Sequence, residues 1–369
     1  LWGFVAPMFL DNLPDLLGGG VKQWFADGNI LLRHMYDVRD FGSDGKQAGR
    51  TNAWRTVLVM SLRNGGQGAI ALDVTNPCKP EFLWQFNEAD LGNTYGQPSA
   101  AQMIIKDSAT LADSSAGGPI VYDPRQGRGV IILPGGQGVE TAGPCTIPSG
   151  DALPEDMVDW DGTAIAPRSE RRCWTTRGRA LYFIDLITGT LLRKIDHSTF
   201  PSPLTGAVSV FRGDTATIAS AAYFTDADGI LCRVDMSSMD PEDWNAVALH
   251  DMYYSDGWDD AESGHNAPVI TVNKAGEVVI LQGTGNIDVL DDANAKNNVV
   301  SVTEKLTFYT SGPRTGQVAT IKGRLNWDLR NSAAAGERLA DGEQVTGPLE
   351  IIDGTVYFGT FDASAPGVC

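Results

Sequence analysis

Short apolar segments separated by polar turns recur along most of the chain, and three of these units share the same order of residues. In each unit an apolar strand ends at an aspartate, a short polar turn follows, and a second apolar strand begins. The three units run over residues 68–86, 179–195 and 229–249. An aspartate favours a tight turn because its carboxylate accepts hydrogen bonds from nearby backbone N–H groups. The aspartates that begin the turns are Asp73, Asp185 and Asp235.

This pattern predicts an all-β fold, a modified β-propeller of about seven blades with long loop inserts. A hairpin unit that recurs through a glycine-rich chain is typical of a propeller. We expect one domain over residues 1–369, with a polar loop at 37–53 and an insert at 140–173, and we expect the chain to be a fragment of a longer protein. A short helical lead-in is predicted near the start from leucines at helical spacing, Leu10, Leu13, Leu16 and Leu17.

Charge and hydropathy narrow the range of partners. The chain has 28 Lys and Arg against 46 Asp and Glu, a formal net charge of −18. A surface that negative repels phosphate backbones, so no nucleic-acid partner is expected. No apolar run approaches the ~18 residues that a membrane-spanning helix needs, so no transmembrane segment is expected in this chain.

The five cysteines indicate one structural disulfide. Cys145 and Cys173 bracket the polar insert, and a covalent tie across its base would remove much of the chain entropy of a long loop. Such a bond implies an oxidising, extracytoplasmic compartment. The alternative is that both are ordinary thiols, as in a cytosolic protein. The sequence assigns no pairing to Cys78, Cys232 and Cys369.

Several segments carry a more specific signal. They are LWGFVAPMFLDNLPDLL at the start, WRTVLVMSLRNGGQGAIALDVTNP from Trp54, and LWQFNEADLGNTYGQPS at residues 83–99. The last is the most specific, because it joins DLG at residues 90–92 to YGQP at residues 95–98. These segments, in this order, resemble the C-terminal domain of PilY-type type IV pilus tip proteins. The resemblance spans almost the whole chain apart from the insert.

The resemblance implies an atypical β-propeller exposed at a pilus tip, on the cell surface or in secreted form, and therefore extracytoplasmic. The family primes pilus assembly together with minor pilins, and it contributes to surface adhesion and twitching motility. We therefore expect a non-catalytic protein that binds minor pilins, the pilus tip complex and an external surface or host ligand. No catalytic residues and no cofactor are expected.

One departure from the family concerns calcium. The best-known members have a loop patterned D-x-[DN]-x-D-G-x-x-D where this chain has residues 207–220. Ser209 and Phe211 occupy the first two ligand positions, and only Asp214 is acidic. Calcium takes roughly six to eight oxygen ligands, several of them carboxylates. We therefore predict that this calcium site is lost.

Asp226 and Asp228 are the remaining calcium candidates, because Asp226-Ala227-Asp228-Gly229 begins like a calcium loop. No acidic residue follows until Asp235, which the repeat places after the next strand. The alternative is a hairpin turn that ends in glycine and is capped by its own carboxylates. We predict this turn rather than a metal site.

One further short motif has two possible interpretations, a binding site or an ordinary turn. Arg212-Gly213-Asp214 is the tripeptide that integrins bind, and an exposed turn could present it to a partner. Three-residue matches arise often by chance, and this one falls in the degenerate calcium loop. An ordinary turn is therefore the preferred interpretation.

Two alternative function classes remain. Propellers with comparable repeats include quinoprotein oxidoreductases, which need calcium on the quinone and a nearby carboxylate base. A glycan-binding propeller is the other alternative, because the nine tryptophans could supply stacking surfaces. Trp54 and Trp84, however, lie in strand patterns and are predicted to be core residues. No catalytic constellation is recognisable.

Overall fold

The fold is all-β, as the sequence predicted. The computed structural model describes residues 2–14, 25–37, 54–106, 127–146, 170–212, 218–252, 263–285, 297–309, 316–326, 339–340 and 342–362. Within these ranges the helical structure consists mainly of short 3₁₀ helices, η1 (Pro7–Asn12), η2 (Arg63–Gly65) and η5 (Pro241–Asp243). The lead-in thus begins with η1, while Leu16 and Leu17 lie outside the described residues. No helix in the described ranges is long and apolar enough to cross a membrane.

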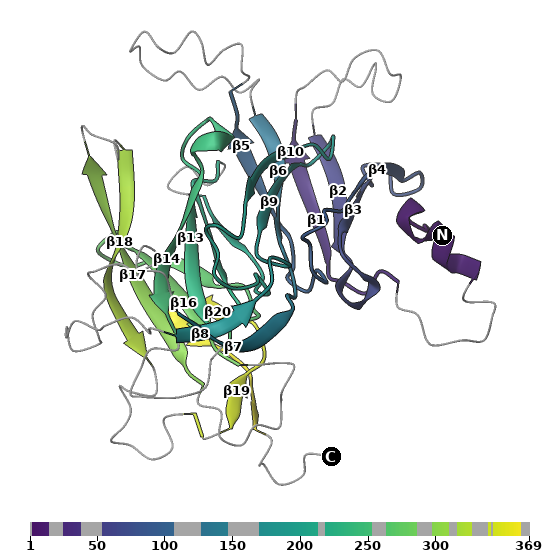
Figure 1. Cartoon of the computed structure of the whole chain (residues 1–369). Helices are drawn as coiled ribbons and strands as arrows, with labels where there is room; N and C mark the ends of the chain where they lie inside the picture. Colours follow the sequence, from purple (N-terminus) through teal and green to yellow (C-terminus); the bar gives the residue numbers. More distant parts are fainter. Residues whose placement is uncertain are drawn as a thin grey trace.

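Four antiparallel four-stranded sheets make up most of the structure (Figure 1). Sheet 1 contains β1 (Ile30–Tyr36), β2 (Trp54–Ser61), β3 (Ala69–Asp73) and β4 (Glu81–Phe86). Sheet 2 contains β5 (Ser99–Ile104), β6 (Gly127–Pro134), β9 (Leu181–Asp185) and β10 (Leu191–Ile195). Sheet 3 contains β11 (Ser209–Phe211), β12 (Ala221–Thr225), β13 (Ile230–Asp235) and β14 (Asn245–Asp251). Sheet 4 contains β15 (Val269–Val272), β16 (Val278–Gly283), β17 (Val299–Tyr309) and β18 (Gly316–Asn326).

Three two-stranded sheets complete the described strands. The first is the hairpin of β7 (Glu140–Thr146) and β8 (Glu170–Trp174). The other two lie near the end of the chain and pair β19 (Glu343–Val345) with β22 (Thr360–Asp362) and β20 (Glu350–Ile352) with β21 (Thr355–Tyr357). The predicted insert at 140–173 therefore begins and ends in paired strands, while residues 147–169 lie outside the described residues.

The four sheets follow one another in chain order, from sheet 1 on the right of Figure 1 to sheet 4 on the left. The first strands of successive sheets lie against one another, β1 against β5, β5 against β11, and β11 against β15. The inner strands of propeller blades meet in this way. The described strands do not form a closed ring, so a propeller of about seven blades and the single domain over 1–369 stay predictions.

The three predicted aspartate turns are confirmed. Asp73 Oδ1 accepts a 2.9 Å hydrogen bond from the Thr75 N–H, and Asp235 Oδ1 accepts one of 2.9 Å from the Ser237 N–H. In the third turn Asp185 Oδ1 accepts from the N–H groups of the two residues after Leu186, at 3.1 and 3.0 Å. Local sequence favours these turns, because the bonds to backbone N–H groups span only two or three positions. Asp73 also reaches across the sheet, since its Oδ2 accepts from Arg55 on β2 at 3.2 Å.

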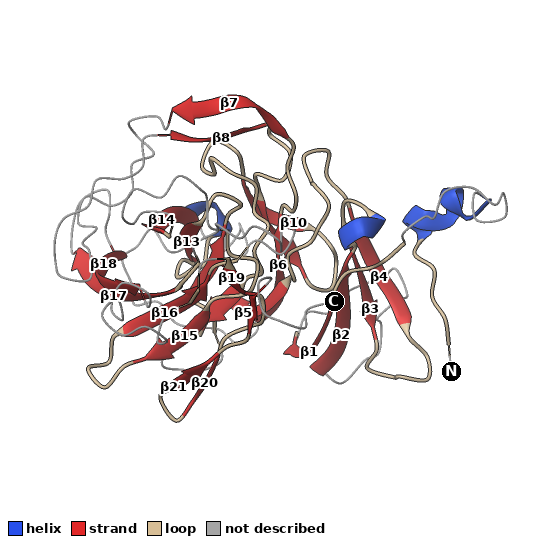
Figure 2. Cartoon of the chain, turned by 90° about the horizontal axis from the view of Figure 1, so that it is seen from below, coloured by secondary structure: helices blue, strands red, loops and turns tan. Residues whose placement is uncertain are grey.

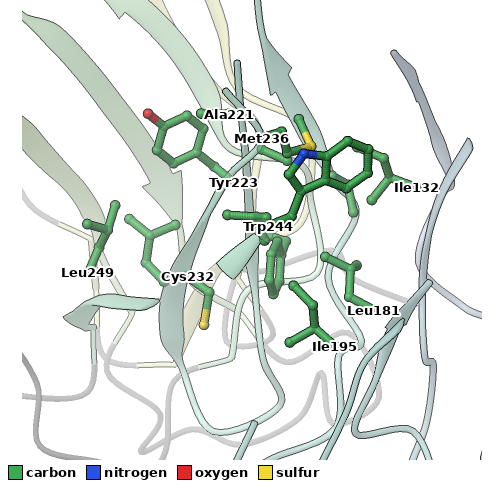
Figure 3. Close-up of a cluster of buried hydrophobic side chains, with 14 of the residues drawn as sticks. Ile132, Leu181, Ile195, Ala221, Tyr223, Cys232, Met236, Trp244 and Leu249 are labelled. Atoms are coloured by element: carbon green, nitrogen blue, oxygen red, sulfur yellow. The ribbon is translucent and has the colours of Figure 1, made fainter. Parts of the chain in front are cut away.

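The largest core cluster joins sheets 2, 3 and 4, and Trp244 lies at its centre (Figure 3). The Trp244 ring meets the Phe183 ring edge-on, with 5.0 Å between centroids, and its indole N–H donates to Ser238 O at 2.8 Å. The bond to Ser238 O gives the buried indole N–H a partner, so the large apolar ring is buried without an unpaired donor.

A second core cluster packs sheet 1 on sheet 2. Trp84 is 5% exposed, as predicted for a core residue, and its indole N–H donates to Leu186 O at 2.8 Å. A Cβ on Gly189, in the aspartate turn of sheet 2, would lie 2.6 Å from the Trp84 ring. Gly189 also has φ of 72°, so both its backbone and the nearby indole require glycine.

Candidate binding surfaces

The segment with the most specific resemblance joins sheet 1 to sheet 2 through Asp90. Its Oδ1 accepts a 2.6 Å hydrogen bond from Tyr182 Oη on β9, and its Oδ2 lies 2.6 Å from Lys194 Nζ on β10. The Lys194 ammonium also lies 5.4 Å from the centroid of the Tyr182 ring. Asp90 therefore anchors the connection between the sheets to two strands of sheet 2.

The electrostatics of this anchor favour the hydrogen-bonded state. Burial raises the pKa of the Asp90 carboxyl, but the bonds with Lys194 and Tyr182 outweigh burial and hold that pKa below its ordinary value. Burial, together with the Asp90 charge, raises the pKa of the Tyr182 hydroxyl. Asp90 thus stays ionised and Tyr182 stays protonated, which are the states that their hydrogen bond requires.

The backbone beyond the aspartate explains the rest of the motif. The Gly92 N–H donates to Gly135 O at 2.8 Å, and a Cβ on Gly92 would lie 1.7 Å from a backbone oxygen of the neighbouring loop. Thr94 Oγ1 accepts from the Leu62 N–H at 2.9 Å and donates to Gly68 O at 2.7 Å. The residues that carry the resemblance therefore form a joint between sheets, and their role is structural.

Asp226 and Asp228 lie in the tight turn between β12 and β13, and both are buried. Asp226 Oδ1 accepts hydrogen bonds from the Asp228 N–H at 3.0 Å and from the Ile230 N–H at 2.7 Å. Gly229, with φ of 81°, completes the turn. This geometry is the self-capped hairpin that the sequence analysis preferred, and the lack of a calcium site at the two aspartates stays a prediction.

The Asp228 carboxylate holds the β7–β8 hairpin, which we call the insert arm, against sheet 3. Arg172 Nε lies 2.6 Å from Oδ1 and Trp174 Nε1 lies 2.9 Å from Oδ2, which also accepts from Ser202 Oγ. The Arg172 guanidinium lies 4.6 Å from the Trp174 ring centroid and donates to Ala227 O at 2.5 Å. We call this set of contacts the Asp228 clamp.

Sequence reasoning missed Arg172 and Trp174. The available signal was their spacing, because residues two apart on a strand share a face and can reach one target. Nothing local pointed to Asp228 as that target, which lies 56 and 54 positions away. The clamp depends on how sheets 2 and 3 are placed, so it is a tertiary feature.

Cys173 lies between these two residues on β8 and is disulfide-bonded. Cys78 and Cys232 carry no disulfide. The Cys145 side chain lies outside the described residues, although its backbone is part of β7. The Cys145–Cys173 pairing therefore stays a prediction.

The segment that the resemblance matches with a calcium loop contains β11. Ser209 Oγ donates to Pro268 O, and Phe211 packs against the core shared by sheets 2, 3 and 4. Arg212 is exposed, whereas residues 213–214 of the tripeptide lie outside the described residues. Among the described residues no group of three or more His, Cys, Asp or Glu could hold a metal ion.

Sheet 1 exposes apolar side chains on the face that turns away from sheet 2, which we call the outward face. The strand register aligns Leu32, Leu58, Leu72 and Phe82 in one row across the four strands. Leu32 is 53% exposed at one end of the row, whereas Leu72 is buried. Phe82, at the other end, is 41% exposed and stacks on Phe4 with 5.8 Å between ring centroids. Exposed apolar side chains gathered on one sheet face are typical of an interaction surface.

Trp54 lies on the same face, and its predicted place in the core is wrong. It is 46% exposed and stacks on His34 with 5.0 Å between ring centroids and 6° between planes. Tyr36 meets the same indole edge-on at 5.3 Å. The strand pattern identified an apolar position, but no sheet within the described ranges covers that position.

A buried ion pair links sheets 3 and 4. Arg233 Nε on β13 lies 3.2 Å from Glu304 Oε1 on β17, and both side chains are buried. Burial raises the pKa of Glu304 above its ordinary value, although the Arg233 charge opposes that rise. Removing one partner of such a pair is costly because the other charge stays buried and unpaired.

Comparison with known proteins adds a family context. No protein-family model matches the chain. It is 36% identical over 88 residues, 23% of its length, to type IV pilus biogenesis factor PilY1 of Pseudomonas aeruginosa PAO1. It is 33% identical over 123 residues, 31% of its length, to the PilY1 of strain UCBPP-PA14. The predicted resemblance to PilY-type proteins is confirmed.

The PilY-type resemblance extends to the fold. The chain matches the crystal structure of the Pseudomonas aeruginosa PilY1 C-terminal domain with a TM-score of 0.57 and 17% identity, over 97% of its own length. It covers 71% of that solved chain. It spans only 6% and 10% of the length of the two curated PilY1 proteins. The fold is therefore that of the PilY1 C-terminal domain.

Proposed function

We propose that this chain is part of a type IV pilus biogenesis factor and that it acts by binding rather than by catalysis. The observation that carries the proposal is the identity to two PilY1 proteins, 36% over 88 residues and 33% over 123 residues, together with the PilY1 C-terminal fold. Its most specific motif, anchored by Asp90, forms a joint of that fold. We propose no reaction, and no cofactor is part of the proposal.

The partners proposed are minor pilins and the pilus tip complex, with an external surface or host ligand as a further target. Two structural features suit a role in binding. Sheet 1 exposes an apolar face, and β20–β21 form a two-stranded sheet whose edge groups can pair with an added strand. Binding at such surfaces would support pilus assembly, adhesion and twitching motility.

The proposed location is extracytoplasmic, at the pilus tip, on the cell surface or in secreted form. The disulfide at Cys173 supports this location, because structural disulfides persist mainly in oxidising compartments. The propeller scaffold is also part of the proposal. It would present loops and sheet edges on a rigid body, which suits a protein that bridges a pilus and a surface.

The test is genetic and uses the protein in its own cells. Deleting the coding segment for these residues should reduce the number of surface pili, counted by electron microscopy, and should reduce attachment and twitching. The matched control is a Glu242→Ala variant, because Glu242 forms an exposed ion pair with Arg193 and 71% of its side chain is exposed. Normal piliation after the deletion, or a loss of substrate oxidation instead, would reject the proposal.

A further inference from the structure

The interface between sheets 3 and 4 is built differently from the other two interfaces between large sheets (Figure 1). In the core between sheets 2 and 3 the Trp244 ring meets the Phe183 ring, and between sheets 1 and 2 the Phe86 ring meets the Tyr182 ring. Each such ring buries roughly 150–250 Å². The described apolar side chains that sheet 4 packs most deeply against sheet 3 are aliphatic and smaller, namely Val278, Ile280, Val300 and Val302.

A polar side chain of sheet 4 also faces sheet 3. Gln282 on β16 shares a face with Ile280, because residues two apart on a strand point to the same side. Its amide approaches sheet 3, since a Cβ on Gly264 would lie 2.8 Å from Gln282 Nε2 and 3.0 Å from Thr225 Oγ1. Gln282 is fully buried, and its Nε2 donates to Gly283 O at 2.8 Å, but its Oε1 has no hydrogen-bond partner.

Asn298 lies on the same face and makes no side-chain hydrogen bond. The strand pairing extends to it from β17, because the Thr284 N–H donates to Asn298 O at 2.9 Å. It is two positions before Val300 and therefore faces sheet 3 as well. Asn298 is fully buried, yet neither its Oδ1 nor its Nδ2 has a hydrogen-bond partner. A buried polar atom without a partner weakens the closed interface, because it has lost water and gained no bond in return.

The Arg233–Glu304 pair lies further along this interface. Both side chains are buried, and Arg233 Nε lies 3.2 Å from Glu304 Oε1, yet neither of these two atoms makes a hydrogen bond of good geometry. The attraction between the charges must offset the cost of removing both from water, which is unfavourable without well-formed hydrogen bonds. Opening the interface would return both charges to water.

The other face of sheet 4 is joined to the C-terminal strands by apolar contacts. Leu281 and Val299 pack there with Val345 and Leu349. The backbone is joined as well, because the Val345 N–H donates to Thr284 O at 3.0 Å. Sheet 4 therefore has an apolar contact with the C-terminal strands and a partly polar, incompletely bonded contact with sheet 3.

We propose that the interface between sheets 3 and 4 is a seam at which the folded chain opens first, because its buried polar contacts are incomplete. Sheet 4 and the C-terminal strands that pack on it move away from sheet 3 as one unit, while sheets 1, 2 and 3 stay packed. The seam follows from packing alone, so it stands whether or not the chain acts in pilus biogenesis.

Cysteine labelling under native conditions tests the seam with two neighbouring residues that face opposite ways. Val300 is fully buried toward sheet 3, whereas Val299 is buried toward the C-terminal strands. Val300→Cys and Val299→Cys are made separately in a Cys78→Ser background, because Cys78 is exposed. The matched control is Val130→Cys, since Val130 is fully buried in the core that sheet 2 shares with sheet 3. Reaction with a maleimide is followed by mass spectrometry of the peptide that contains each new cysteine.

The expected result is that residue 300 reacts at least about tenfold faster than residues 299 and 130. Equal rates at residues 299 and 300 would overturn the proposal, because sheet 4 would then unfold rather than move as a unit. A rate at residue 300 no faster than at residue 130 would also overturn it. Ile280→Cys and Leu281→Cys, which face the same two ways, replace the pair on β17 if either valine variant does not fold.

A second variant tests the polar origin of the seam. Arg233→Met combined with Glu304→Leu replaces the buried charges by apolar side chains of similar size, so the closed state should be favoured. We expect residue 300 to react at least about threefold more slowly in this background. The matched control is Arg193→Met with Glu242→Leu, which removes an ion pair whose glutamate is 71% exposed and should leave the rate unchanged. An undiminished rate at residue 300 in the Arg233→Met, Glu304→Leu background would count against the seam.

Discussion

Asp228→Ala is expected to release the insert arm from sheet 3 while the large sheets stay folded. The Asp228 carboxylate is fully buried and accepts from Arg172, Trp174 and Ser202. A hydrogen bond to a charged group contributes roughly 1.5–3 kcal/mol. The Arg172 side chain is 37% exposed, so water can solvate its guanidinium once the carboxylate is removed. We therefore count its bond to Asp228 as contributing less than the other two. We expect the free energy of local unfolding of the insert arm to fall by about 3 kcal/mol, with little effect on the large sheets.

Hydrogen exchange measures this loss directly. Peptides covering residues 140–146 and 170–174 should exchange about 100-fold faster in Asp228→Ala, which corresponds to the lost free energy under rapid local opening. Asp228→Asn should have a smaller effect, because its amide oxygen still accepts from Trp174 or Ser202. The control Glu242→Ala removes an exposed ion pair with Arg193 and should change exchange little. Unchanged exchange of the arm in Asp228→Ala would refute the clamp.

Three further predictions concern pH, redox state and calcium. The pKa of the Asp90 carboxyl is lower in the folded protein than in the unfolded chain. Its contribution to stability should therefore be full above about pH 4 and should be lost as the pH falls through the folded-state pKa. Urea melts of wild type and Asp90→Asn should therefore converge at low pH, and a constant difference would contradict the anchor. Non-reducing peptide mapping should recover Cys145 joined to Cys173, and free alkylated thiols would contradict this bond. The melting temperature should not respond to millimolar calcium or chelator, and a chelator-induced fall of several degrees would restore a calcium site at Asp226 and Asp228.

The sequence predicted the features that depend on near neighbours. Asp73, Asp185 and Asp235 cap the turns that follow them, since each carboxylate reaches N–H groups two or three positions away. The two strands expected in each of the three repeat units also form, as β3 and β4, β9 and β10, and β13 and β14, because apolar alternation and polar turns specify short extended segments. Local chemistry therefore predicted the fold class and its repeating unit.

Contacts between sheets could not be predicted in the same way. Arg172 and Asp228 are 56 positions apart, and the sequence around neither residue indicates that the other is its partner. Arg233 and Glu304 likewise belong to different sheets and meet only when those sheets pack. A single sequence contains no signal for such pairs, because either residue would be acceptable on a solvated surface.

Trp54 and Trp84 show how burial depends on the neighbouring sheet. Both tryptophans lie in apolar strand patterns of sheet 1, yet Trp84 is 5% exposed and Trp54 is 46% exposed. The difference arises because Trp84 faces sheet 2, whereas Trp54 lies on the outward face. An apolar strand pattern indicates which positions favour burial. Whether a position is buried depends on whether another sheet packs over it. The exposed Trp54 therefore marks a part of the outward face that no sheet of the described residues covers.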